Sequence, residues 1–408
     1  MTALYLYDDR RARTFEPFAS TRPVSELVAG TALIRRRWAA VLAPENAQFL
    51  AGPRHVDFDE PGAIAATGTI PTGSIIALSR CVPALPADPA NVARRAATCS
   101  MWRCGNELAA VRVKQPIDVA AFADGTLTLE ELHAGTGAIG TIDGWWLEEV
   151  WDLVALLQAQ LASDLATPAF ANGLAPANAG VIGTGRVTVA PDAVIEPYVV
   201  FDASAGAIHV AAGSHIHAFT RLVGPCYIGR NVTVMGGDIS GSSIGDVCKV
   251  RGELSSSVFL GHSNKGHDGF VGHSYLGRWV NLGAGTVTSN LKNTYGSVSL
   301  WTPSGVRETG LQFLGTLFGD HVKTGIGLRL TTGSVLGAGA NVYGNMPPKA
   351  VAPFSWGDAP PYSLYRADKF LEAASRMMAR RQVTLTDRAR RHLSAVHAER
   401  WSVEIAES

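Results

Sequence analysis

The stretch Gly261–Leu291, GHSNKGHDGFVGHSYLGRWVNLGAGTVTSNL, indicates the fold of this chain. It continues a repeat in which an aliphatic residue followed by glycine recurs every sixteen residues, at Ile228-Gly229, Ile244-Gly245, Leu260-Gly261 and Leu276-Gly277. Further aliphatic residues lie between these pairs at spacings of five or six. A helix face repeats at about 3.6 residues and a strand face at about two, so neither fits. The stretch also carries a histidine and several polar side chains within this repeat, which indicates a site embedded in a scaffold.

A repeat of this length fits a solenoid of short, flat strands in which each coil places aliphatic side chains inward. Glycine suits the corners of such coils because it adopts backbone conformations that other residues avoid. We therefore predict a left-handed parallel β-helix over residues 189–352. The alternative is an ordinary β-sandwich, but turns every eight to twelve residues or so would not keep the spacing this regular.

The remaining sequence suggests one further domain and two connecting regions. At 408 residues the chain is long enough for two domains, and residues 1–165 are predicted to form a mixed α/β domain. Its first strand, Leu4–Tyr7, runs directly into charged residues, and a helix is expected over residues 25–40. Residues 166–188, rich in Ala, Gly, Pro and Asn, are predicted to be a linker. Residues 353–408 form a helical tail with two amphipathic helices, whose arginines are interpreted as a solvated face.

Composition narrows the class of protein. Lys+Arg and Asp+Glu both total 35, so the net charge of zero gives no sign of a nucleic-acid partner or an anionic membrane. Five cysteines without a CxxC pair argue against a disulfide framework or a zinc site. The chain turns acidic after seven residues, too early for a signal peptide, and no apolar run approaches the roughly eighteen residues that span a bilayer. We expect a cytoplasmic protein.

A histidine within the repeat is the candidate catalytic group. Glu253 lies fourteen residues before His267, and Asn281 lies fourteen after it, so coils of about sixteen residues are expected to stack the three side chains. A neutral imidazole is the usual general base near pH 7, and a carboxylate on one ring nitrogen leaves the other free to take a proton. The alternative is a histidine that is merely satisfied within a β-protein.

Several segments resemble a known enzyme family. KVRGEL, GHSNKGHDGFVG and RWVNLGAGTVTSNLKNTYG resemble the acyltransferase half of the bifunctional enzymes that acetylate glucosamine 1-phosphate and then uridylylate it. The opening DDRRARTFEPFASTRP, with NKGHDG, TGLQF and PFSWG, is similar to a divergent bacterial subfamily of sugar nucleotidyltransferases. The resemblance spans nearly the whole chain. It implies a nucleotidyltransferase domain followed by a left-handed β-helix.

The resemblance also implies roles for individual residues of the β-helix. His267 matches the general base that deprotonates the sugar amine, Glu253 matches the carboxylate that orients it, and Asn281 and Asn290 match asparagines that bind substrate. Phe270 stands where the family has a substrate-contacting tyrosine. Further substrate contacts are expected from Lys249, Arg251, Lys265, Lys292 and Tyr295. The phosphates of acetyl-CoA or another acyl-CoA are expected at Lys323 and Arg329, beside Ile326, which replaces a small residue of the family's acyl-CoA cleft.

The N-terminal half departs from the family pattern. Sugar nucleotidyltransferases carry a glycine-rich loop whose amides cradle a triphosphate, but here the glycines are missing and Val24-Ser25 occupy the place of the motif's lysine. Arginines are able to replace amides as phosphate ligands, so nucleotide binding is assigned to Arg10, Arg11, Arg13 and Arg22. Asp8 and Asp9 are candidates to hold Mg²⁺, with a loop cap as their alternative use. The other reading is that this loop has lost catalysis.

Three functions remain open from the sequence. The first is an enzyme that uses a sugar phosphate, a nucleoside triphosphate or nucleotide sugar, and an acyl-CoA, assembled as a homotrimer. The second keeps only nucleotidyl transfer, with the β-helix as a trimer scaffold. The third is a non-catalytic protein that binds a sugar nucleotide or serves in assembly. A hairpin over residues 297–309 is expected to interrupt the repeat, either to cover a neighbouring subunit's site or as a structural protrusion.

Overall fold

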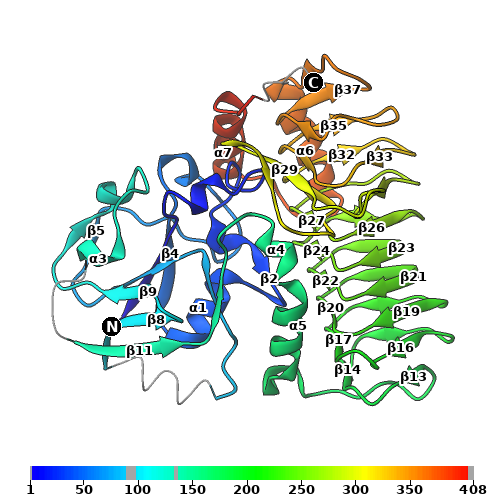
Figure 1. Cartoon of the computed structure of the whole chain (residues 1–408), viewed down its shortest axis with the longest axis horizontal. Coiled ribbons are helices and arrows are strands. Elements are labelled where there is room, and N and C mark those ends of the chain that lie inside the picture. Colours follow the sequence, from blue (N-terminus) through cyan, green and yellow to red (C-terminus); the bar gives the residue numbers. More distant parts are fainter. Residues whose placement is uncertain (1, 89–97, 133–136, 403–408) are drawn as a thin grey trace. The chain divides into compact units, whose positions relative to one another are not determined.

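The computed structural model describes residues 2–88, 98–132 and 137–402. These residues divide into two compact units (Figure 1). The first comprises Met1–Phe15, Ala19–Val150 and Thr386–Val396, and the second Glu16–Phe18, Trp151–Leu385 and His397–Ser408. Among the described residues, no helix combines the length and apolar character needed to cross a membrane.

The first unit is built on a mixed sheet in the order β11-β8-β9-β6-β1-β4. The strands are β1 (Ala3–Tyr7), β4 (Asn46–Leu50), β6 (Ile75–Leu78), β8 (Cys99–Cys104), β9 (Glu107–Arg112) and β11 (Ala138–Ile142). Strand β1 pairs in parallel with both β4 and β6, so three carboxyl ends share one edge of the sheet. The predicted α/β class is confirmed.

Short elements complete this unit. Two-residue and three-residue strands pair as β2 (Val28–Ala29) with β3 (Ala32–Leu33), β5 (Thr69–Ile70) with β10 (Ile117–Asp118), and β7 (Cys81–Pro83) with β12 (Gly144–Trp146). Among the described residues of this unit, the α-helices are α1 (Ile34–Leu42), α3 (Leu129–Leu132) and most of α7 (Asp387–Ala398). Helix α1 begins nine residues later than predicted, because Val24–Glu26 forms a 3₁₀ turn and β2 and β3 follow it.

The second unit is a parallel β-helix, as the repeat predicted (Figure 1). One face is formed by β14 (Val187–Val189), β17 (Ile208–Val210), β20 (Cys226–Ile228), β22 (Ser243–Ile244), β24 (Val258–Phe259), β27 (Tyr275–Leu276), β31 (Thr316–Phe318), β34 (Ser334–Leu336) and β36 (Ala350–Val351). The others contain β13 (Gly180–Ile182), β15 (Val194–Ile195), β16 (Val200–Asp202), β18 (His215–Ile216), β19 (Thr220–Val223), β21 (Thr233–Ser240), β23 (Lys249–Ser255), β25 (Asn264–Lys265), β26 (Phe270–Gly272), β28 (Val287–Thr288), β32 (Lys323–Thr324), β33 (Arg329–Leu330), β35 (Asn341–Val342), β37 (Ser355–Gly357) and β38 (Ser363–Leu364).

The inward residues explain the aliphatic repeat. Ile228, Ile244, Phe259 and Leu276 are in register on successive coils and fully buried in one core. Their separations are sixteen, fifteen and seventeen residues, so the inward residue of the third coil is Phe259 and not Leu260, as the strict count of sixteen implied.

Two of the four repeating glycines, Gly245 and Gly277, serve close packing, which differs from the expected reason, whereas Gly261 has a positive φ of 145°. Gly245 and Gly277 are absent from the glycines with positive φ. A Cβ at Gly245 would lie 2.5 Å from the carbonyl oxygen of Phe259, and one at Gly277 would lie 2.4 Å from Asp320 Oδ1. The left-handed corner conformation is instead adopted two residues later, by Val247 at φ 63° and Trp279 at φ 62°.

The boundaries differ in part from the predicted ones. Strand β13 already pairs with β16, so the β-helix begins within the segment expected to be a linker. The helices α4 (Asp152–Ala155) and α5 (Leu157–Ala166) belong to the second unit.

The predicted hairpin is formed by β29 (Ser299–Thr302) and β30 (Gly305–Glu308). In the tail, β37 and β38 precede α6 (Ala367–Ala379) and α7. Arg391 of α7 pairs with Asp57 at 3.0 Å, so this arginine is not purely solvated.

Candidate functional site

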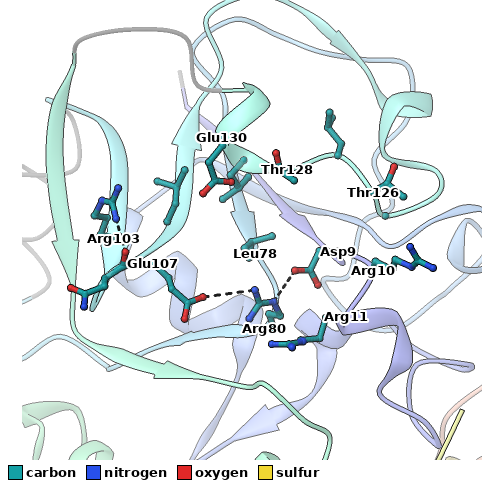
Figure 2. Close-up of a pocket in the computed structure, with 15 residues that line it drawn as sticks. Asp9, Arg10, Arg11, Leu78, Arg80, Arg103, Glu107, Thr126, Thr128 and Glu130 are labelled. Atoms are coloured by element: carbon teal, nitrogen blue, oxygen red, sulfur yellow. Dashed lines mark hydrogen bonds and ion pairs between the residues drawn. The ribbon is translucent and has the colours of Figure 1, made fainter. Parts of the chain in front are cut away.

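An open pocket of about 550 Å³ lies at the carboxyl ends of β1 and β6 (Figure 2). Both strands are buried, and charged residues follow each of them. Asp8 and Asp9 come directly after β1, and Ser79 and then Arg80 come after β6. This is the edge where open α/β sheets bind ligands. The lining residues are Asp9, Arg10, Arg11, Leu78, Arg80, Arg103, Asn106, Glu107, Leu108, Gly125, Thr126, Leu127, Thr128, Leu129 and Glu130.

Arg80 is the centre of the polar network in this pocket. Its Nε donates to Asp9 Oδ2 at 2.7 Å, and its Nη2 lies 4.0 Å from Glu107 Oε2 (Figure 2). Its Nη1 donates to Glu148 Oε1 at 3.2 Å. Its guanidinium carbon lies 4.8 Å from the centre of the Trp146 ring. The side chain is only 12% exposed, so these partners fix its position. Arg80 is not among the residues predicted from the sequence, although it follows a buried strand just as Asp8 and Asp9 do.

Three backbone amides of the loop after β1 donate hydrogen bonds within the first unit. The amide of Arg10 donates to the Gly125 carbonyl at 2.8 Å, that of Ala12 to Asp9 Oδ1 at 2.9 Å, and that of Arg13 to the Asp9 carbonyl at 3.2 Å. These groups are therefore not directed at the pocket. The loop offers side chains where the related family offers amides, which agrees with the loss of the glycines.

The four arginines assigned to nucleotide binding separate into two pairs. Arg10 and Arg11 line the pocket, and the guanidinium of Arg11 pairs with Glu148. Arg13 and Arg22 do not line it. Arg22 is buried, pairs with Glu60 at 2.9 Å and lies over the ring of Phe58, so its role is to hold the fold.

Arg13 supports one wall of the pocket. Its guanidinium donates to the carbonyls of Asp8, Phe122 and Ala123 at 2.9, 2.7 and 2.6 Å. It thereby ties the end of β1 to the loop that leads into the lining residues 125–130. The fit is close, because a Cβ at Gly125 would lie 2.8 Å from Arg13 Nε, and Gly125 has φ +77°. Arg13 therefore holds one wall of the pocket in place and does not itself line the pocket.

The two aspartates expected to hold Mg²⁺ do not form a metal site together. Asp8 is buried, accepts the amide of Val24 at 3.0 Å and does not line the pocket. Asp9 lines it, but one oxygen caps Ala12 and the other is paired with Arg80. The loop cap, the alternative use, is what Asp9 does here. The two residues therefore do not fit Mg²⁺ as a pair.

Burial makes Asp8 sensitive to pH. Desolvation raises the pKa of its carboxyl from 3.8 to about 7, against the opposing effect of Ser79 and the Val24 amide. A raised pKa means that the folded protein binds this proton more tightly, so the associated stability is complete below about pH 4 and is lost as pH rises through about 7.

We therefore predict that Asp8→Asn stabilises the chain at pH 8. The amide keeps an acceptor for Val24 and removes the buried charge, so the gain is at most about 4 kcal/mol for a shift of this size. Thermal unfolding at pH 5 and pH 8 measures it: the difference between the two midpoints should shrink in the variant. If the variant is less stable than the parent at both pH values and also loses nucleotide binding, the Asp8 carboxylate is needed for both properties.

In the β-helix, register does not stack the predicted catalytic trio. Glu253 lies opposite Phe270, and Asn281 lies opposite Asn264, whose Nδ2 donates to Asn281 Oδ1 at 2.9 Å. His267 lies in the exposed corner between β25 and β26. Within the described residues, no hydrogen bond joins its ring to Glu253 or Asn281. The expectation from spacings of fourteen was wrong because in-register residues here are seventeen apart.

A second imidazole lies closer to the predicted polar residues. Asn290 Nδ2 lies 2.9 Å from His273 Nδ1, and the ring of His273 stacks on Phe313 with centroids 5.2 Å apart. A Cβ at Gly272 would lie 2.4 Å from the Phe270 ring and 2.6 Å from Asn290 Nδ2, so these two side chains share the space that glycine leaves. Burial lowers the pKa of His273. The sequence analysis missed His273, although its HS pair repeats that at His262-Ser263.

The predicted cationic residues have different surroundings. Lys265 is buried in an inward position, where its Nζ donates to the carbonyls of His267 and Arg251 at 2.8 and 3.1 Å, and burial lowers its pKa to about 8. Arg251 pairs with Asp268 at 2.9 Å. Burial also lowers the pKa of Lys323 to about 8. The exposed or partly exposed members of the predicted set are Lys249, Lys292, Tyr295, Ile326 and Arg329.

Comparison with known proteins finds a family match in the N-terminal part of the chain. Residues 4–169 match the family model described as sugar nucleotidyl transferase. The matched region includes β1, β6 and every residue that lines the pocket.

Two curated relatives carry names that describe bifunctional proteins. The bifunctional protein GlmU of Koribacter versatilis is 28% identical over 193 residues, which are 41% of this chain and 37% of that protein. The bifunctional sugar-1-phosphate nucleotidylyltransferase/acetyltransferase of Sulfurisphaera tokodaii is 34% identical over 91 residues, 22% of this chain and 23% of its own length. The matched segments thus span well under half of these relatives. An acetyltransferase structure from Bacillus cereus aligns with 54% of this chain and 97% of its own, at 16% identity and a TM-score of 0.20.

Proposed function

We propose that the N-terminal unit binds a nucleoside triphosphate or a nucleotide sugar and that the chain is a sugar-1-phosphate nucleotidyltransferase. The observation that carries this proposal is the pocket at the ends of β1 and β6, where guanidinium groups and carboxylates alternate. Guanidinium groups donate paired hydrogen bonds to phosphate oxygens, and carboxylates accept hydrogen bonds from sugar hydroxyls. A ligand that carries both groups matches this lining.

The proposed reaction needs charge stabilisation more than covalent help. A sugar phosphate oxygen attacks the α-phosphorus of the triphosphate, the new P–O bond forms, and pyrophosphate leaves. Arg10 and Arg11 would neutralise charge on the phosphate oxygens, while the fixed Arg80 holds Asp9 beside them. The pair between Arg11 and Glu148 is largely exposed, at 52% and 38%, so little free energy is lost when Arg11 turns to a phosphate.

We further propose that the β-helix transfers an acyl group from acyl-CoA to a sugar amine. Support comes from the cluster of Asn290, His273 and the Phe270 ring, with Glu253 in the register position opposite Phe270. His267 at the neighbouring corner is the proposed general base, since its ring is exposed. Transfer breaks the thioester C–S bond and forms an amide, and the base takes the proton that the amine loses.

A non-catalytic binding protein is the second candidate. It is favoured by one observation, namely that the loop after β1 has committed both its amides and the oxygens of Asp9 to its own structure. Calorimetric titration of the full chain with nucleoside triphosphates, nucleotide sugars and acyl-CoAs, followed by product analysis with Mg²⁺ present, separates the candidates. Binding with turnover supports the enzyme, binding without turnover supports the second candidate, and no binding contradicts both.

We propose a homotrimer and predict a mass about three times the 43.1 kDa of the chain in light scattering. Coils of a β-helix present flat faces, which suit closed cyclic assembly. The measurement should be made over a tenfold range of concentration, since a specific trimer keeps its mass across it. A particle with the mass of one chain at all concentrations would contradict the trimer.

A further inference from the structure

Two histidines and a glutamate meet on an outer corner of two early coils of the β-helix. Glu196 directly follows β15, His215 begins β18, and His217 directly follows β18. Ile195 pairs with Ile216, so Glu196 and His217 lie opposite one another on neighbouring coils. His215 leaves the same face of the sheet as His217, because residues two apart along a strand share a face.

The carboxylate of Glu196 is oriented toward the two rings. Its Oε2 accepts the amide of Ala218 at 2.9 Å, which leaves Oε1 for the histidines. His215 Nε2 lies 2.8 Å from Oε1 and His217 Nδ1 lies 3.6 Å from it. The imidazole rings stack with centroids 4.3 Å apart and planes 23° from parallel. Hydrogen bonds to the carboxylate, from the Ala218 amide first and from His215, lower the pKa of Glu196, so it is ionised at neutral pH.

These separations match the needs of a small metal ion. The three ligand atoms all lie within 4.8 Å of one another. Around tetrahedral Zn²⁺, with bonds of about 2.0–2.1 Å, neighbouring ligand atoms are about 3.3 Å apart. The distances of 2.8 and 3.6 Å from Glu196 Oε1 fall on either side of that value, so small side-chain movements are sufficient. Two imidazoles and one carboxylate favour Zn²⁺ and its neighbours over Mg²⁺ and Ca²⁺, which prefer oxygen.

We propose that Glu196, His215 and His217 bind a divalent transition-metal ion of the Zn²⁺ type, with the fourth position open to water. All three side chains are partly exposed, at 33–40%, so an ion and its water have access. This site lies outside the predicted acyl-transfer residues. It uses no cysteine, and its ligands come from two coils and form no short sequence motif.

The backbone at this corner also fixes the ligands. Tyr198 and Phe219 follow Glu196 and His217 by two residues, adopt positive φ of 66° and 62°, and stack with centroids 5.7 Å apart. Their turns end the strands just after the ligands on both coils. A corner defined in this way lowers the entropy lost when the metal orders the side chains.

Calorimetric titration of the chelator-treated full chain with ZnCl₂ tests the proposal. We expect one ion per chain, and at least about 100-fold weaker binding for His217→Ala, because even outer-shell changes cost about 10–100-fold. The matched control is Asp192→Asn, which removes an exposed carboxylate from the same region and should leave Zn²⁺ binding unchanged. Glu196→Gln should weaken binding as well, and it serves if His217→Ala fails to fold.

Co²⁺ provides a second readout that does not depend on activity. Bound in a four-coordinate site it gives strong visible absorption, which Zn²⁺ should abolish by displacement and excess Mg²⁺ should not. The proposal is overturned if the parent chain gives no Zn²⁺ heat or Co²⁺ absorption, or if His217→Ala and Glu196→Gln bind Zn²⁺ as tightly as the parent.

Discussion

Replacing Arg10 and Arg11 together with alanine is expected to weaken nucleoside triphosphate binding about 100-fold or more. Both side chains line the pocket at the end of β1. A hydrogen bond to a charged group contributes about 1.5–3 kcal/mol, and 1.4 kcal/mol corresponds to a tenfold change in affinity. Two such contacts therefore account for the expected loss. Calorimetry of the full chain measures it directly.

Other variants decide whether the effect is specific. Arg36→Ala with Arg390→Ala removes the same charge from positions outside the pocket, on α1 and α7, and should leave affinity within about twofold. Arg13→Ala should act differently, lowering the unfolding midpoint because three carbonyls lose their donor. If the Arg10 and Arg11 variant binds like the parent, the pocket is not the nucleotide site.

The fold was predictable because its repeat constrains every coil. An inward position such as Ile228 or Ile244 has no alternative to an apolar side chain, so the pattern is visible in the sequence. What could not be predicted was register around the corners. Coils of fifteen and of seventeen residues look alike when only the spacing of aliphatic residues is counted. They nevertheless change which polar side chains lie opposite one another on the coils around His267.

The pocket at the ends of β1 and β6 shows a different limit. Arg10 and Arg80 both line it, and each closely follows a buried strand, which is a signal visible in the sequence. By contrast, Arg13 and Arg22 looked equivalent to Arg10 in sequence, because all follow the first strand closely. Only the three carbonyls around Arg13 and the Glu60 partner of Arg22 reveal that these side chains are committed to the fold.

His267→Ala is expected to lower acyl transfer by about 10²- to 10⁴-fold, the usual contribution of a positioned general base. The exposed corner residue makes no side-chain hydrogen bond within the described residues, so its removal should not lower the unfolding midpoint. Release of CoA thiol from acetyl-CoA, with glucosamine 1-phosphate as the first acceptor tested, measures the rate. The cysteines of the chain are all buried, so a thiol reagent should report CoA with little reaction from the folded protein.

His273→Gln is the informative comparison, because His273 is the imidazole that contacts Asn290. If His267 is the base, this variant should keep most of the rate, and its change should appear mainly in KM. If His273 is the base, His273→Gln should lose most of the rate and His267→Ala should keep it. The acid limb of the pH profile of kcat/KM should then lie below the ordinary imidazole pKa of about 6.5, because burial lowers the pKa of His273. If both variants transfer acyl groups as fast as the parent, neither histidine is the base. The alternative in which the β-helix serves only as a scaffold is then favoured.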